Sequence, residues 1–255
     1  MRCLWTVGEI AVNEIHIPIL YEDNHILVVE KPPNVPSQLD SSGDPDMLTL
    51  LKADLKRRYA KPGNVFLGLV HRLDRPVGGV MVFAKTSKAA SRLSEQVRNR
   101  SFHKTYLAVV HGALQSDRAT LKDYLLKDPS ANHVRVVPPS TPGSLEAILH
   151  YERLATDNNL SLIRVNLLTG RSHQIRVQFS SIGHPLWGDQ RYGFEQNLPG
   201  QQLALWSYTI DLCHPTRREM LSYSTPPPIN SLPWINFRKT LEEAEMYGIT
   251  GNRQE

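Results

Sequence analysis

Hydrophobic residues follow two different periods along the chain, which predicts a mixture of strands and helices. Short apolar runs rich in β-branched residues predict buried strands, because branched side chains pack well on a pleated surface. Apolar residues three and four positions apart instead predict helices with one buried face. The predicted strands cover residues 26–29, 65–70, 80–84, 105–110, 134–137, 145–154, 160–168, 203–212 and 219–224, and the predicted helices cover 48–59, 87–99, 172–182 and a C-terminal segment that ends near Tyr247.

Turn-forming residues separate these elements. Thr86 or Ser87 can cap the second helix, and Gly183 can end the third one in a left-handed conformation. Four turn formers at residues 156–159 predict a hairpin between the strands on either side. The chain shows no internal repeat and no flexible linker, so we expect one mixed α+β domain with small extensions.

The composition is that of an ordinary globular protein, with 40% hydrophobic and 21% charged residues among 255, which excludes a peptide hormone and a disordered chain. No apolar run approaches the roughly 20 residues of a membrane-spanning helix, and no signal-like apolar core follows the N-terminus. Cys3 and Cys213 stand alone, which argues against a disulfide framework and a zinc site. We therefore expect a cytoplasmic protein that does not bind membranes. Its net charge of +4 permits a polyanionic partner without requiring one.

The loop at residues 71–79, between two predicted buried strands, is the most unusual stretch of the chain. It places Asp74 between Arg72 and Arg75, and nearby cations favour the charged form of a carboxyl group. Asp74 is therefore a candidate nucleophile rather than a general acid, although the spacing alone favours a structural ion pair. Gly78-Gly79 follows, and two adjacent glycines allow a sharp turn or the close approach of another group.

A second group of polar residues lies at 170–176, where the third predicted helix begins. The exposed amides of a helix start, together with Arg171 and Arg176, suit an anion. Arg176 also lies beside the apolar stripe of this helix, where an unpaired guanidinium is costly. We therefore expect Arg176 to pair with a carboxylate, and Asp74 is the candidate.

Other enzyme classes find little support in the sequence. The ten histidines form neither the motif of zinc deaminases nor the His-Glu-x-x-His of zinc proteases. The phosphate-binding loop of nucleotide hydrolases and the Gly-x-Ser-x-Gly elbow of ester hydrolases are also absent. A retaining glycosidase needs a second carboxylate about 5 Å from the nucleophile. The sequence leaves this class open, although no second acidic residue accompanies the basic ones around Asp74.

Four motifs follow one another between about Tyr21 and Tyr223. They are His-Arg-Leu-Asp at 71–74 before a Gly-Val strand, Lys104-x-Tyr106, Gly-Arg-Ser-His-Gln-Ile-Arg at 170–176, and Gly-His-Pro-Leu-x-Gly-Asp at 183–189. In this order, the motifs closely resemble the RluA family of RNA pseudouridine synthases.

The resemblance implies a mixed, mainly antiparallel central sheet flanked by helices and loops, with a cleft for RNA. It implies a catalytic domain at 21–230, a short N-terminal extension at 1–20 and a C-terminal helical extension at 231–255. We expect no S4 RNA-binding domain, because the residues before Tyr21 are too few to form one. The implied reaction converts uridine in ribosomal or transfer RNA to pseudouridine without a cofactor or a metal, and we expect a monomer.

Residue roles carry over from the same resemblance. Asp74 is similar to the catalytic aspartate, and Arg176 to the partner of that carboxylate. Tyr106 is similar to the ring that packs on the flipped uracil, with a hydroxyl placed to assist proton removal from C5. Arg72 is similar to the side chain that fills the space left by the flipped base, and Leu205 to an apolar floor under the uracil. The expected RNA-binding residues are Arg72, Arg75, Arg171, His173 and Leu205.

The sequence departs from the family pattern at two places. Val77-Gly78 stands where the family usually has Thr-Ser, and Trp206 replaces a common histidine. The nucleophile is untouched, so we expect activity. A rival interpretation is an RNA-binding or ribosome-assembly protein without catalysis, which the retained catalytic set argues against. Another is a hydrolase acting on a nucleoside, which would release free base.

Overall fold

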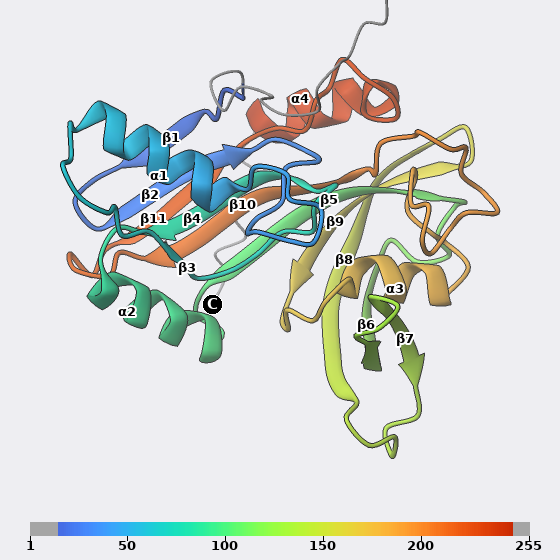
Figure 1. Ribbon diagram of the computed structural model, residues 1–255. Coiled ribbons are helices and arrows are strands. Elements are labelled where there is room, and N and C mark those ends of the chain that lie inside the picture. Colours follow the sequence, from blue (N-terminus) through green and yellow to red (C-terminus); the bar gives the residue numbers. More distant parts are fainter. Residues whose placement is uncertain (1–14, 247–255) are drawn as a thin grey trace, which may run out of the picture.

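The computed structural model describes residues 15–246, which form a large sheet with helices packed on its faces (Figure 1). The strands are β1 (Ile19–Glu22), β2 (Ile26–Lys31), β3 (Gly68–Leu69), β4 (Gly78–Ala84), β5 (His103–His111), β6 (Arg118–Asp128), β7 (His133–Val137), β8 (Leu145–Asp157), β9 (Leu160–Leu167), β10 (Leu205–Cys213) and β11 (Met220–Ser224). The helices are α1 (Met47–Arg58), α2 (Ser87–Arg98), α3 (Gln174–Ser181), the short 3-10 helix η1 (Trp234–Phe237) and α4 (Arg238–Met246). These elements confirm the predicted α+β class.

The strands follow one another across the sheet in the order β1-β2-β4-β10-β5-β9-β8-β6-β7, with β11 paired to β10 and β3 to β4. Within residues 15–246, β4 and β10 form the one parallel pair, and the other pairs are antiparallel. The parallel contact joins Gly78 to Trp206 and Gly79 to Ser207. The sheet therefore has two parts, β1–β4 and β5–β9, which meet through a short contact at β10.

The two faces of the sheet carry separate cores, as alternation along β5 shows. Tyr106 and Ala108 belong to the core that contains α1 and α3. Leu107 and Val109, which lie between and beyond them in the sequence, belong to the core that contains η1 and α4. Successive residues of a strand point to opposite faces, so β5 contributes to both cores.

Local sequence sets the helix ends largely as predicted. Asp46 caps α1 with its carboxylate, and Thr86 caps α2 by accepting the amide of Ala89 at 3.1 Å. Helix α3 starts at Gln174, two residues later than predicted, because His173 adopts a left-handed conformation with φ of 52°.

The strand predictions hold less evenly. The predicted strand at 65–70 is too long, because pairing with β4 is limited to Gly68 and Leu69. The sequence analysis does not predict β6, whose alternation of charged and apolar residues yields no apolar run; its pairing with β8 at residues 118–125 forms it instead. Asn158 and Asn159 both have positive φ, which confirms the β8–β9 hairpin.

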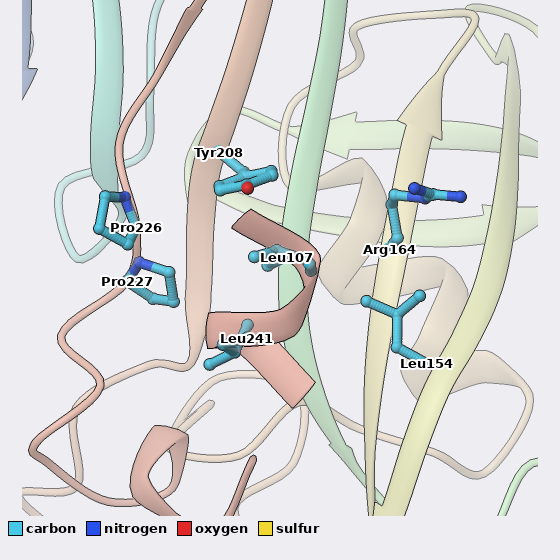
Figure 2. A pocket seen from close by; sticks show the side chains of 8 residues that line it. Leu107, Leu154, Arg164, Tyr208, Pro226, Pro227 and Leu241 are labelled. Carbon is cyan, nitrogen blue, oxygen red and sulfur yellow. The ribbon is translucent and has the colours of Figure 1, made fainter. Parts of the chain in front are cut away.

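The C-terminal helices close one face of the sheet. Trp234, Phe237 and Leu241 pack in one core with Leu107 and Val109. Figure 2 shows the space that remains between β5, β10 and α4, with a volume of about 20 Å³. This is room for about one water, far below the roughly 300 Å³ of a small-ligand pocket. The predicted helix end near residue 247 lies outside the described residues.

Candidate active site

A buried lysine holds the loop that carries Asp74. Lys31, at the end of β2, donates its ammonium protons to the carbonyl oxygens of Pro32, Arg75 and Val77 at 3.1, 3.0 and 2.6 Å. Burial lowers the pKa of Lys31 to about 7, while the negative charge of Asp74 acts to raise it. The sequence analysis does not single out this lysine. Its position at the end of an apolar strand, directly before two prolines, is the signal that could have found it.

Gly78 and Gly79 lie where this loop enters β4 and where β4 meets β10. A Cβ added at Gly78 would lie 2.3 Å from the Trp206 ring, and one at Gly79 would lie 2.2 Å from the carbonyl oxygen of Ser207. Gly79 also has a φ of +113°, which favours glycine. The expected close approach is therefore confirmed. Gly78 and Trp206, both departures from the family pattern, contact one another.

Arg176, on α3, joins Asp74 to a second carboxylate to which the sequence analysis assigns no role. Its guanidinium donates from Nε and Nη2 to the two oxygens of Asp189 at 2.7 and 2.9 Å, and from Nη1 to Asp74 Oδ2 at 3.2 Å. The expected contact with Asp74 is present, but Asp189 is the main partner. Asp189 belongs to the motif at 183–189, and its burial requires a cation beside it.

The electrostatics of this network follow from the burial of its members. Burial acts to lower the pKa of Arg176, but the two carboxylates raise it above its ordinary value. Burial acts to raise the pKa of Asp189, but Arg176 and the backbone amides of Arg191 and Tyr192 hold it below its usual range. The Asp189 side chain is completely buried, whereas that of Asp74 is 29% exposed. Asp74 is therefore the carboxylate of this pair that a substrate can reach.

Tyr106 and Leu205, on the neighbouring strands β5 and β10, lie in the same buried core. Burial raises the pKa of the Tyr106 hydroxyl, the charge of Asp74 raises it further, and Ser207 acts against both. The phenol is therefore neutral and can donate a hydrogen bond. Asp74 acts on it electrostatically, so the structure brings these two predicted residues together.

His173 lies beside Asp74, with its Nε2 3.9 Å from Asp74 Oδ2. Its Nδ1 lies 2.7 Å from the hydroxyl of Tyr192. Burial lowers the pKa of His173, and the charge of Asp74 acts to raise it. The Tyr192 ring also covers the guanidinium of Arg176, 5.1 Å from the ring centre, as in a cation–π contact. No sequence motif points to Tyr192.

The other predicted RNA-binding arginines have unequal surroundings. Arg72 is exposed, and no hydrogen bond or ion pair holds it within residues 15–246. Arg75 forms an ion pair with Asp44. Arg171 donates from Nε to the carbonyl oxygen of Glu146 at 2.8 Å, which turns it toward the β8 backbone. Only Arg72 of these three is fully available to a ligand.

The site combines a reachable carboxylate, a neutral phenol and an apolar surface. A carboxylate in such surroundings can act as a nucleophile toward a bound ring or sugar. Among residues 15–246, no three His, Cys, Asp or Glu side chains gather as a metal ion would require. The same part of the chain contains no helix that is long and apolar enough to span a membrane.

The family model of the RNA pseudouridylate synthases matches residues 25–181. The chain belongs to this family. The uncharacterized RNA pseudouridine synthase YhcT of Bacillus subtilis is 34% identical, over 83% of this chain and 69% of that protein. Ribosomal large subunit pseudouridine synthase D of Xylella fastidiosa is also 34% identical, over 85% of this chain and 67% of that protein. The resemblance to the RluA family is thereby confirmed, and the chain is an RNA pseudouridine synthase.

Solved structures agree with the fold of this RNA pseudouridine synthase. Human RNA Pseudouridylate Synthase Domain Containing 4 superposes with a TM-score of 0.72 at 21% identity, over 88% of this chain and 93% of that one. Human RNA Pseudouridylate Synthase Domain Containing 1 gives 0.67 at 24% identity, over 87% of each chain. At these identities the likeness concerns the fold.

Proposed function

We propose that this enzyme isomerises specific uridines in structured RNA through nucleophilic attack by Asp74 on a uridine flipped out of its stack. One observation carries the proposal: a buried guanidinium, fixed by Asp189, presents a second and reachable carboxylate beside a tyrosine ring. Four relatives are named as ribosomal large subunit pseudouridine synthases. This supports ribosomal RNA as the substrate, with transfer RNA as the alternative.

The reaction exchanges one bond of the uridine for another. A carboxylate oxygen of Asp74 attacks ribose C1′, the bond from C1′ to N1 breaks, and the uracil leaves with the electron pair. The uracil turns, C5 attacks C1′, and the bond to Asp74 breaks. The proton on C5 is then lost and N1 gains a proton, so no atom is added or removed. This sequence uses no cofactor and no metal. A closed site keeps water from the intermediate.

Tyr106 has two tasks in this sequence. Its ring packs on the flipped uracil while Leu205 supports the base from below, which holds the uracil during rotation. The charge of Asp74 contributes to the raised pKa of the Tyr106 hydroxyl. Formation of the ester would remove that charge and so lower the pKa of the hydroxyl, so the phenolate, which is the form that accepts the C5 proton, would be easier to reach once the C1′–N1 bond has broken. Proton removal from C5 would thus follow bond cleavage.

Arg72 supplies the flipping step. Its exposed and unrestrained guanidinium can enter the space that the uridine leaves and stack on the neighbouring bases. Specific sites are then those where opening the stack costs least.

The test compares Asp74→Asn with wild type on cellular RNA from cells that lack this gene. The substitution keeps the shape and removes the nucleophile, so we expect pseudouridine formation to fall by about 10³-fold or more. RNA affinity should change by less than about threefold, because phosphate contacts dominate affinity. Asp157→Asn, at the distant β8–β9 hairpin, is the matched control and should retain activity. Turnover by Asp74→Asn at the wild-type rate would refute the proposal, and release of free uracil would indicate a hydrolase.

A further inference from the structure

Lys104 occupies a distinctive place in the site. It lies on β5 two residues before Tyr106, so both side chains leave the strand on the same side, about 7 Å apart along it. A Cβ added at Gly170 would lie 3.1 Å from Lys104 Nζ, so the ammonium rests against this glycine. Gly170 begins the segment that carries Arg176. The ammonium therefore lies between β5 and the start of α3, next to the proposed uracil position.

This ammonium has no partner within residues 15–246, since neither a hydrogen-bond acceptor nor a carboxylate reaches it. Its side chain is nonetheless partly buried, and burial lowers the pKa of Lys104. Its neighbour His71 cannot serve as an acceptor. His71 Nε2 accepts the backbone amide of Val82 at 3.0 Å, so the ring proton lies on Nδ1, and that atom is itself buried without a partner.

The fully buried Lys31 provides a comparison, because its contacts are those of a lysine with a structural role. Lys31 donates to three carbonyl oxygens and holds the loop. Lys104 donates to no such group, although a partly desolvated charge without a partner destabilises a fold. The unpaired ammonium of Lys104 would be stabilised by a bound anion. The anionic groups of the substrate are its phosphates, since uracil and ribose are neutral.

We propose that Lys104 binds a backbone phosphate of the RNA next to the flipped uridine. The inference rests on the proposed function and deepens it. It also revises the sequence-based choice of cations. Arg75 is occupied by Asp44 and Arg171 by a backbone carbonyl, whereas Lys104 is preformed and unoccupied within the described chain. Anchoring a phosphate beside Tyr106 fixes the register of the strand, so that one uridine alone can reach Asp74.

The experiment measures RNA affinity against salt for three variants and wild type. The probe is a fluorescein-labelled oligouridylate of about ten nucleotides. Lys104→Met keeps the length of the side chain and removes the charge, so the slope of log affinity against log salt should become less steep by about 0.7. Lys104→Arg should keep the wild-type slope. Lys239→Met removes the same charge from a side chain that is 91% exposed on α4, on the other face, and should leave slope and activity unchanged.

Two further readouts separate binding from a structural role. Lys104→Met should melt at or above the wild-type temperature, because an unpaired charge gives way to an apolar chain. Its KM for RNA should rise more than its kcat falls, because the lost contact is to the backbone. A variant that precipitates is replaced by Lys104→Gln, for which the same slope change is expected.

An unchanged salt slope for Lys104→Met would overturn the inference, and a lowered melting temperature with that slope would make Lys104 structural. The proposed function is judged separately, because its test is the rate of Asp74→Asn and the product that the wild-type enzyme forms. A wild-type enzyme that isomerises RNA while Lys104→Met binds like wild type would leave the proposed function standing and remove this phosphate contact.

Discussion

The side chains on the two faces of β5 have different surroundings. Leu107 points into the apolar layer under α4, where about one water would fill the remaining space (Figure 2). Its neighbour Tyr106 points the other way, toward the charge of Asp74 and the segment that carries Arg176. The face under α4 is mostly apolar, and its Arg164 is paired with Glu152, whereas the other face holds charges of which only some are paired. Both faces therefore carry a hydrophobic core, and the charged groups of the candidate site gather on the face of Tyr106.

Arg176→Ala should produce the largest effect, because it should reduce both the stability of the fold and the activity of the site. It leaves the buried Asp189 and the neighbouring Asp74 without their cation. We expect a stability loss of about 3–5 kcal/mol, as for other broken buried pairs, and no detectable isomerisation. Denaturant unfolding and single-turnover assays at a temperature where the variant is folded measure the two effects.

Leu241→Ala, in the core under α4, is the matched control. It removes a buried side chain under η1 and β5, so stability should fall by roughly 2–5 kcal/mol. Activity of the folded protein should persist, because no residue of the site is touched. Equal loss of activity in both variants would show that the two faces are not separate in function.

Gly78→Ser should have an intermediate effect, because it acts where the two parts of the sheet meet. The new Cβ would press on the Trp206 ring, and such overpacking costs about 1–3 kcal/mol. Trp206→His removes the ring and its hydrogen bond to the carbonyl oxygen of Thr225, at 2.8 Å. Combining both changes should recover about 1 kcal/mol or more relative to their sum, as measured by urea unfolding. Strict additivity would mean that the two positions are independent.

His71→Gln should give the smallest effect at neutral pH, and its difference from wild type should grow as the pH falls. Burial lowers the pKa of His71 to about 3, with the charge of Lys104 as a second cause. The unfolded chain therefore binds the proton first as pH falls, so stability is present above about pH 6.5 and is lost toward pH 3, by at most ~1.4 kcal/mol per unit. Glutamine can accept the amide of Val82 but does not titrate. The melting temperature of His71→Gln should fall less than that of wild type between pH 6.5 and 4. An equal fall for both proteins would contradict this account.

Strands and helices with strong local patterns could be predicted from the sequence. The cap at Thr86 and the Asn158-Asn159 turn act on their immediate neighbours, so spacing alone reveals them. β6 escaped prediction because half of its residues are polar, and only pairing with β8 makes it a strand. Such pairing joins residues that are 20 (Leu125 and Leu145) to 34 (Arg118 and Glu152) positions apart, which local patterns do not report.

The site could be predicted in part. Asp74, Tyr106 and Arg176 follow from motifs, and their proximity agrees with those motifs. The role of Asp189 could not be predicted, because its contact with Arg176 forms only when residues 183–189 fold back onto α3. The contacts of Arg75 with Asp44 and of Arg171 with the Glu146 carbonyl could not be predicted for the same reason, because these partners are distant in the sequence.

The position of β10 in the sheet has a consequence for how the enzyme folds during its synthesis on the ribosome. Among the strands of residues 15–246 it is the tenth to be synthesised, yet it lies between β4 and β5 at the centre of the sheet. Until it emerges, both strands expose edges that can pair with the wrong partner, so the nascent chain depends on rapid late insertion or on chaperones. Asp74 precedes β4 and Arg176 follows β9. A half-made chain therefore lacks the contact between Arg176 and Asp74.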